Sequence, residues 1–305
     1  MILNSTGNGP DIVLLHGWGL GSAIWAPVVD ALAQRCRVHL IDLPGYSGPV
    51  TRMDQQSTNM HRQNPHEQTI LANACARTPF DAPSRASTDS VSTFVKTADA
   101  LSNALPENSI LCGWSLGGML ALQVAMQAAI QTENQASLRA PQRIKGLILI
   151  AGTPSFTQRA DWPHAQPSSL LDAFSEAVRN DAATTLQRFI ALLNQGDLQA
   201  RALSRQMTRL ALASPLPDTD TLLTGLSWLR DVDLRAQLPS IKAPTLLIHG
   251  EHDPLMPLAA AQWLKDQLPN ARLEVFPATA HTPFLADPVR FARQASDFCH
   301  EITAC

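Results

Sequence analysis

The feature that most constrains the fold is the stretch LCGWSLGGML, residues 111 to 120. It sets Ser115 between Gly113 and Gly117, with an apolar strand-like run before it and an alanine-rich helical run after it. This G-x-S-x-G spacing predicts a sharp strand-to-helix turn that holds the serine in a strained backbone conformation and projects its hydroxyl above a sheet. The alternative is a glycine-containing turn with an incidental serine. The strand, the helix and Gly118 favour a nucleophile.

Short apolar runs rich in β-branched residues recur along the chain. Most are near-continuous, as expected for strands buried on both faces of a parallel sheet, and helical patterns separate several of them. The runs occupy residues 12–15, 38–41, 109–112, 146–150, 245–248 and 272–276. They predict an α/β fold with a mostly parallel, doubly wound sheet.

Two long segments interrupt this rhythm, and a shorter polar one lies at about 131–142. Residues 48–88 are polar with little periodicity, which predicts a long surface insertion to which we assign no function. Residues 154–238 are helical in pattern and fall between strand-rich regions, which predicts an inserted helical lid. The core would then comprise residues 1–153 and 239–305.

A serine hydroxyl is a poor nucleophile at neutral pH unless a base accepts its proton, and an acid must orient that base. The segment TLLIHGEHDPLMP predicts a strand followed by Asp253, and LEVFPATAHTPF predicts the next strand followed by His281. Both side chains would lie at the carboxyl edge of the sheet, where Ser115 emerges. In chains with this kind of serine turn, the catalytic residues follow one another in the order serine, acid, histidine. The same order is present here, so we predict a triad of Ser115, Asp253 and His281.

Other histidines and acids fit the pattern less well. His249 and His252 lie too close to Asp253 in sequence to act as its base from the next loop, and His16 precedes the whole serine turn. Asp231 and Asp233 close the lid segment, where solvated surface acids are the default interpretation. Taken singly, Asp253 and His281 would also be ordinary loop residues.

Acyl transfer through a serine also needs two N–H donors for the oxyanion that forms. Leu116, directly after Ser115, would provide one. The loop in LLHGWGL, residues 14 to 20, would provide the other, with Trp18 as the predicted donor. The alternative for this loop is a plain glycine-rich turn after a strand.

Composition limits the remaining classes. With 45% hydrophobic residues, 16% charged residues and a formal net charge of −3, the chain is typical neither of nucleic-acid binders nor of disordered proteins. Its five cysteines show no CxxC or metal-ligand spacing, so we expect reduced thiols. The predicted serine mechanism requires no metal or organic cofactor, and we expect none. The first residues show no basic region followed by a long apolar core, and no apolar run approaches about 20 residues, so we expect an unprocessed, cytoplasmic protein that does not span a membrane.

The motifs HGWG, DLPG (42–45), GWSLGG (113–118), HGEHD (249–253) and AHTPF (280–284) together resemble the α/β-hydrolase family over nearly the whole chain. Within it the chain bears a closer resemblance to the bacterial carboxylesterases that act on pimeloyl-[acyl-carrier protein] methyl ester in biotin synthesis. That closer likeness includes HLIDLPGYS, GWSLGGMLALQVA, DWP, RFIAL and VDLR. The polar insertions are longer than we expect for those esterases.

The resemblance implies roles for further residues. The lid side of an acyl channel would be lined by Phe189, Ile190, Ala191, Leu192 and Leu193. The substrate would also contact Trp18, Ser115, Leu116 and His281. Arg188, Arg201 and Arg205 match lid arginines that dock the acidic carrier protein in those esterases. Arg209 shares a helix face with Arg201 and Arg205, because the three are spaced at i, i+4 and i+8, and we therefore predict that Arg209 also docks the carrier protein. By itself, that spacing indicates only a solvent-exposed basic face of a helix. We expect the protein to be a monomer.

Other functions of the same fold stay open at this point. A generic short-chain carboxylesterase, a lactonase or a C–C bond hydrolase would use the same triad, and so would an acyltransferase. A non-catalytic receptor on this fold is disfavoured, because such proteins have usually lost a triad member and all three positions are filled here.

Overall fold

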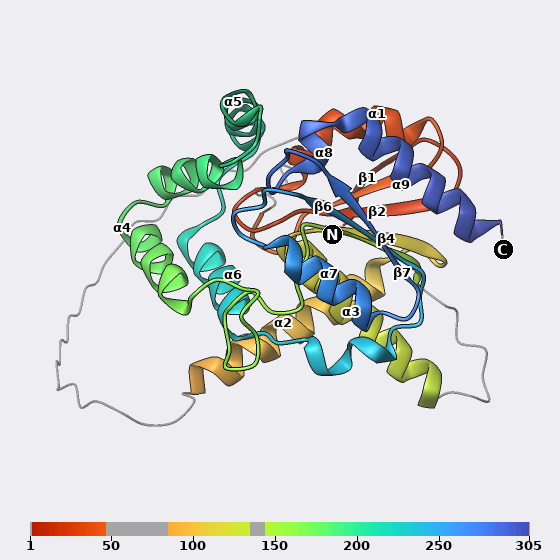
Figure 1. Ribbon diagram of the computed structural model, residues 1–305, viewed down its shortest axis with the longest axis horizontal. Coiled ribbons are helices and arrows are strands. Elements are labelled where there is room, and N and C mark those ends of the chain that lie inside the picture. Colours follow the sequence, from red (N-terminus) through yellow and green to blue (C-terminus); the bar gives the residue numbers. More distant parts are fainter. Residues whose placement is uncertain (1, 47–84, 135–143, 305) are drawn as a thin grey trace, which may run out of the picture.

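The computed structural model describes residues 2–46, 85–134 and 144–304, and its centre is a twisted seven-stranded sheet (Figure 1). The strands are β1 (Ile2–Thr6), β2 (Asp11–Leu15), β3 (Arg37–Ile41), β4 (Ser109–Trp114), β5 (Ile144–Ile150), β6 (Thr245–Gly250) and β7 (Ala271–Phe276). Their spatial order is β1-β3-β2-β4-β5-β6-β7. All neighbours from β3 onward pair in parallel, and only β1 is antiparallel to its neighbour β3. The six predicted strands and the doubly wound parallel sheet are confirmed, and β1 is an additional edge strand.

Helices cover both faces of the sheet. They are α1 (Ala26–Ala33), α2 (Arg85–Ala104), α3 (Leu116–Asn134), α7 (Leu258–Gln267), α8 (Pro283–Ala286) and α9 (Pro288–Thr303), with short 3-10 turns at Ser22–Trp25 and Arg235–Ser240. Helices α1 and α9 pack together on one face, and α2, α3 and α7 lie on the other (Figure 1). None of the described helices is long and apolar enough to cross a membrane.

Within the described residues three helices lie between β5 and β6: α4 (Ser168–Leu193), α5 (Ala200–Ala211) and α6 (Thr219–Asp231). They stand together beside the sheet, where Figure 1 draws them in green to cyan. Helix α4 is kinked at Asp181, whose backbone is not helical. These helices fall in the segment where a lid is predicted, and the division of the chain into core and lid stays a prediction.

The two polar insertions fall largely outside the described residues. Of the segment 48–88, the structure describes only the last residues, which begin helix α2 at Arg85. Of the segment 131–142, it describes only the end of α3.

The centre of the sheet explains where a functional site can form. Strand β4 pairs with β2 on one side and β5 on the other, and every residue of β4 is buried. Because β2, β4, β6 and β7 all run parallel, the loops at their carboxyl ends meet at one edge of the sheet. These are the loops that carry the predicted site residues.

Candidate active site

Ser115 lies in the tight turn between the end of β4 and the start of α3. Its φ is +55°, a left-handed conformation that costs a residue other than glycine about 1 kcal/mol or more. The turn is held by backbone hydrogen bonds: Ser115 N–H donates to Ile150 O (2.9 Å), and Gly118 N–H donates to Ser115 O (2.9 Å). Ser115 is 6% exposed, so its hydroxyl lies in a nearly closed environment.

The two glycines of the motif are required by close backbone contacts. A Cβ atom on Gly113 would lie 2.3 Å from the carbonyl oxygen of Gly117. A Cβ atom on Gly117 would lie 2.6 Å from the carbonyl oxygens of both Leu15 and His16, on strand β2 and its following loop. The predicted strand–turn–helix is therefore present, and it is packed directly against the HGWG loop.

Asp253 and His281 form a hydrogen-bonded pair. Nδ1 of His281 lies 2.7 Å from Oδ2 of Asp253, and both side chains are fully buried. The other oxygen, Oδ1, accepts the backbone N–H groups of Leu255 and Met256, each at 2.9 Å. Since Oδ1 already has two donors, Oδ2 is the atom that faces the imidazole.

The charge state of this pair follows from its surroundings. Burial alone would raise the pKa of Asp253, but the neighbouring His281 and the hydrogen bonds to the carboxylate outweigh burial and hold that pKa below its usual value. The carboxylate is therefore ionised and can stabilise an imidazolium. Within the described residues Nε2 of His281 has no hydrogen-bond partner, which leaves this nitrogen available to a proton donor.

The loop that carries His281 is in contact with the serine turn. Nε1–H of Trp114, the residue before Ser115, donates to the carbonyl oxygen of His281 at 2.9 Å. The two rings have centroids 5.6 Å apart. The three predicted triad residues thus come from loops after β4, β6 and β7, at one edge of the sheet.

The other histidines have different surroundings. Nε2 of His16 accepts the N–H of Leu43 (2.9 Å), and Nδ1 is 2.8 Å from the carbonyl oxygen of Gly17, so both ring nitrogens are used. Burial lowers the pKa of His16, which keeps the ring neutral. His16 thus joins the HGWG loop to the DLPG loop, a structural role that sequence reasoning did not identify.

His249 and His252 are also engaged elsewhere. Nε2 of His249 lies 2.7 Å from the carbonyl oxygen of Met256 and 3.6 Å from Oδ2 of Asp253. Burial lowers the pKa of His249 as well. His252 is exposed, and its Nδ1 is 3.2 Å from the carbonyl oxygen of Gly196.

The predicted oxyanion donors belong to two segments that adjoin Ser115, the start of α3 and the HGWG loop. Leu116 is the first residue of α3, so its N–H has no acceptor within the helix. The HGWG loop approaches from β2, and a Cβ atom on Gly17 would lie 3.2 Å from Cβ of Ser115. The Trp18 side chain anchors this loop to the lid, because its Nε1–H donates to the carbonyl oxygen of Leu222 at 2.8 Å.

The predicted lid lining occupies the last turn and a half of α4. Phe189, Ile190 and Leu193 are buried, and the Phe189 ring meets Trp18 edge-on at 4.8 Å between centroids. Leu192 is partly buried and Ala191 is exposed. Five consecutive residues cannot share one face of a helix, so Ala191 does not face the interior with the others.

The four predicted docking arginines, Arg188, Arg201, Arg205 and Arg209, are all exposed on α4 and α5. Arg205 and Arg209 line a groove between these helices together with Gln187 and Ile190. The four arginines therefore place positive charge on the solvent-exposed sides of these two neighbouring helices.

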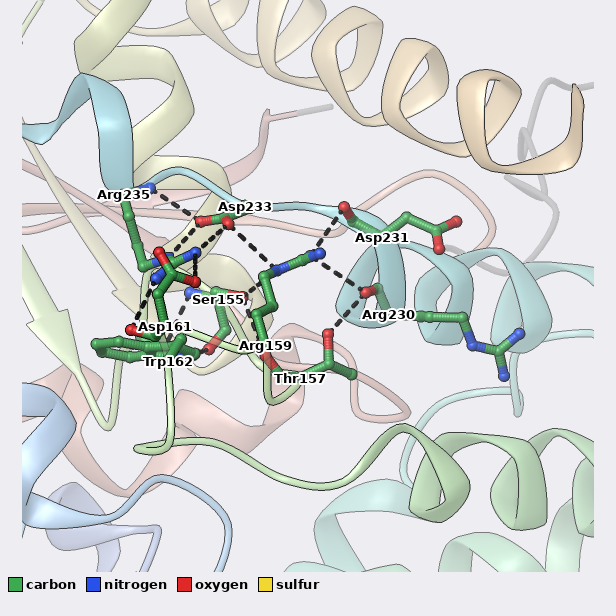
Figure 2. A network of polar contacts seen from close by, with 10 residues as sticks. Ser155, Thr157, Arg159, Asp161, Trp162, Arg230, Asp231, Asp233 and Arg235 are labelled. Carbon is green, nitrogen blue, oxygen red and sulfur yellow. Dashed lines mark hydrogen bonds and ion pairs between the residues drawn. The ribbon is translucent and has the colours of Figure 1, made fainter. Parts of the chain in front are cut away.

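A polar network joins the two ends of the lid segment to each other (Figure 2). Asp233 lies 2.8 Å from Nη2 of Arg235 and 3.2 Å from Nε of Arg159. Arg159 also donates to the carbonyl oxygen of Asp231 at 3.2 Å. The guanidinium of Arg235 stacks over Trp162, with 5.5 Å between its central carbon and the ring centroid.

This network changes the interpretation of the acids near the lid. Asp231 and Asp233 lie at the surface but are not isolated there, since exposed Asp233 pairs with two arginines and half-buried Asp231 accepts a hydrogen bond from Ser90 Oγ at 2.5 Å. Ser155 and Asp233 form an antiparallel bridge, and Leu234 N–H donates to Pro154 O at 2.9 Å. The chain therefore enters and leaves the lid through adjacent, paired residues. Within the described residues no three His, Cys, Asp or Glu side chains are grouped to hold a metal.

Comparison with known proteins agrees with this fold. Residues 10–288 match the family model described as alpha/beta hydrolase fold. Two proteins named pimeloyl-[acyl-carrier protein] methyl ester esterase are similar over almost the whole chain. The one from Nitrosomonas europaea is 36% identical over 95% of both chains, and the one from Vibrio campbellii is 34% identical over 96% of both. Among solved structures, the esterase EaEST from Exiguobacterium antarcticum superposes with a TM-score of 0.71 at 22% identity, covering 97% of this chain and 94% of that one.

Proposed function

The chain belongs to the alpha/beta hydrolase fold family and is a carboxylic-ester hydrolase, and we propose that its substrate is the methyl ester of pimeloyl-[acyl-carrier protein]. The products would be methanol and the free ω-carboxylate on the carrier protein, a step of biotin synthesis. This choice of substrate is supported by the names of the two relatives, whose sequences align with nearly the whole chain. The observation on which the chemistry depends is the buried Asp253–His281 pair beside the serine turn.

In the acylation half-reaction, the Ser115 hydroxyl attacks the ester carbonyl while Nε2 of His281 accepts its proton. Asp253 keeps Nδ1 protonated and stabilises the imidazolium that forms. The N–H groups of Leu116 and Trp18 bind the negative oxygen of the tetrahedral intermediate, and one such donor is worth about 2.7–4 kcal/mol. The intermediate then expels methoxide, which takes the proton from His281 and leaves as methanol.

In the deacylation half-reaction, His281 accepts a proton from a water molecule as that water attacks the acyl-serine carbonyl. The second tetrahedral intermediate expels the Ser115 oxygen, which recovers its proton from His281. The free carboxylate leaves on the carrier protein. Water and these side chains suffice for both half-reactions, so no metal or organic cofactor takes part.

The arginine surface on α4 and α5 would receive the carrier protein. Arg201, Arg205 and Arg209 are exposed on one helix, and Arg188 lies on the neighbouring helix. An acidic carrier docked there would bring its acyl chain to the lid helix whose buried residues Phe189 and Ile190 lie near Trp18. Charge complementarity of this kind mainly raises the association rate and weakens with salt.

The direct test compares the carrier-bound methyl ester with free methyl and p-nitrophenyl esters, lactones and vinylogous diketones. We expect hydrolysis of the esters, with the highest kcat/KM for the carrier-bound one, and loss of at least about 10³-fold in Ser115→Ala. Ser227→Ala, a serine change in the lid outside the site, is the matched control. Full ester hydrolysis by Ser115→Ala would overturn the assignment, and faster turnover of lactones or diketones would replace it with another hydrolase.

A second test addresses the carrier and the pathway. Reversing the charge of Arg201, Arg205 and Arg209 should lower kcat/KM for the carrier-bound ester by about tenfold or more and leave p-nitrophenyl ester kinetics unchanged. Arg293→Glu, an exposed change on α9, is the control. The intact gene should restore biotin-independent growth to a strain lacking its own esterase. No rescue by a protein that still cleaves simple esters would indicate a generic esterase.

A further inference from the structure

The turn between α4 and α5 lies against the loop that carries His281. We call residues 194–199 the lid turn and residues 278–282 the histidine loop. Leu198 N–H in the lid turn donates to the carbonyl oxygen of Ala278 at 3.3 Å. His281 N–H donates in the opposite direction, to the carbonyl oxygen of Leu193 at 3.1 Å, at the end of α4. The two segments are thus joined by backbone hydrogen bonds although they lie about 80 residues apart in sequence.

Two buried polar side chains of the lid turn bind the residues on either side of His281. Oδ1 of Asn194, which is fully buried, accepts the Thr282 hydroxyl at 3.0 Å. Oδ2 of Asp197, which is 8% exposed, accepts the N–H of Ala280 at 3.0 Å. Three consecutive residues of the histidine loop are therefore each hydrogen-bonded to the lid.

Both side chains are themselves fixed in orientation. Nδ2 of Asn194 donates to the carbonyl oxygen of Ile190 at 2.8 Å, so its Oδ1 is the atom left for Thr282. Oδ1 of Asp197 accepts the N–H of Gln199 at 2.7 Å, which leaves Oδ2 for Ala280. Groups held in this way can transmit a definite geometry to their partners.

The histidine loop has reason to need such support. Ala278 has a φ of +54°, which a residue other than glycine seldom adopts and which persists only where surrounding contacts maintain it. The Asp253 bond fixes one nitrogen of the imidazole, but the ring can still shift with the backbone that bears it. A displacement of about 1 Å in a catalytic group can cost on the order of 100-fold in rate.

We propose that Asn194 and Asp197 are positioning residues, which hold the histidine loop from the lid so that Nε2 of His281 stays aligned with Ser115. The proposal rests on the proposed role of His281 as the base. It assigns the lid a part in the chemical step as well as in substrate binding. Loss of these bonds slows the reaction of every ester, whether or not it is bound to a carrier.

The test removes the two bonds one at a time. Thr282→Val deletes the hydroxyl that Asn194 accepts, Thr282→Ser restores it, and Asp197→Ala removes the acceptor for Ala280. With a short p-nitrophenyl ester, we expect Thr282→Val and Asp197→Ala to lower kcat by about 10- to 100-fold with little change in KM. The acid limb of the kcat/KM profile should move to lower pH, because a looser Asp253–His281 contact stabilises the imidazolium less. Thr282→Ser should recover most of the rate.

Two lid variants serve as matched controls. Thr185→Val removes a similarly buried hydroxyl bond to Asp181 O (2.7 Å), and Asp218→Ala removes a carboxylate that accepts Thr221 N–H (2.7 Å). Neither side chain contacts the histidine loop, so kcat and the pH profile should stay at wild-type values.

Each remaining outcome is decisive. If both test variants fold and keep the wild-type kcat and pH profile, or if the rate falls only in proportion to the unfolded fraction, the proposal is wrong. If Asp197→Ala does not fold, the pair Thr282→Val and Thr282→Ser gives the answer alone. His281→Ala is measured in parallel to distinguish failure of this proposal from failure of the proposed function. A fully active His281→Ala would show that His281 is not the catalytic base.

Discussion

The Oδ2 atom of Asp253 lies 2.7 Å from Nδ1 of His281, and the other carboxylate oxygen is bound by two backbone N–H groups. The loop of Asp253 thus orients the carboxylate through Oδ1, and Oδ2 is directed at His281. A carboxylate suits this place because both of its oxygens are acceptors.

Replacing Asp253 with Asn should therefore be severe. The amide oxygen of Asn would accept the N–H groups of Leu255 and Met256, which turns the amide nitrogen toward His281 and favours the wrong imidazole tautomer. We expect kcat to fall by about 10⁴-fold with the fold retained. Stopped-flow hydrolysis of a p-nitrophenyl ester measures this, with Asp218→Asn as the control. A loss of less than tenfold would contradict the assigned orientation.

The stability of the protein should depend on pH through His16. Burial lowers the pKa of His16 in the folded state below the ordinary 6.5, so the unfolded chain takes up a proton first as the pH falls. Stability is then present above about pH 6.5 and is lost below it, at up to about 1.4 kcal/mol per pH unit for one such group. His249, with a pKa lowered for the same reason, adds a loss in the same direction.

Urea unfolding at intervals between about pH 5 and 8 tests this dependence. His16→Gln keeps an acceptor for Leu43 N–H and removes the titrating group. Its free energy of unfolding should fall less steeply with acid than that of the wild type. Parallel curves for the two proteins would show that His16 does not titrate in this way.

The serine turn should not tolerate a side chain at Gly117. A Cβ atom there would lie 2.6 Å from two backbone carbonyl oxygens, which neither strand β2 nor the turn can avoid without moving. We expect Gly117→Ala to lower the free energy of unfolding by about 3 kcal/mol or more and to abolish activity. At Gly152 the nearest atom to a new Cβ is Leu149 Cβ at 3.4 Å, an ordinary contact, so Gly152→Ala is the control. Equal stabilities of the two variants would refute the close-contact argument.

The polar network at the base of the lid should hold the two ends of the lid segment together. Arg235→Gln removes ion pairs to Asp233 and Asp161 and the contact with Trp162. We expect faster hydrogen exchange in residues 154–166 and 228–235, and a loss of about 1–3 kcal/mol in the free energy of unfolding. Lys265→Gln, which breaks an exposed ion pair with Asp266, should change stability by less than about 1 kcal/mol. Unchanged exchange in Arg235→Gln would exclude an anchoring role.

The sheet could be predicted from sequence because its strands carry their own signal. Strands buried on both faces read as continuous apolar runs, and six of the seven were located in this way. Strand β1 was missed because ILNST contains three polar residues and pairs on one side only, at the edge of the sheet. Short edge strands carry little of the apolar pattern that reveals a buried one.

The contacts around the candidate site could be predicted only in part. The placement of Ser115, Asp253 and His281 at one edge of the sheet could be predicted because strand ends bring distant loops together there, a rule that needs no knowledge of side-chain packing. Asn194 and Asp197 gave no such signal, since their partners lie more than 80 residues away in sequence. Asp233 gave no signal either, because its partner Arg159 lies at the other end of the lid segment.

The pairing of Ser155 with Asp233 bears on how such chains diversify. Because the chain leaves the predicted core and returns to it at neighbouring, hydrogen-bonded residues, the segment between them is an insertion whose two ends are adjacent. An insertion of this kind can be lengthened, shortened or exchanged by recombination without displacing the strands to which it is attached. New substrate ranges can therefore arise through replacement of one contiguous stretch of the gene that does not encode Ser115, Asp253 or His281, provided that the new stretch again forms hydrogen bonds with the histidine loop.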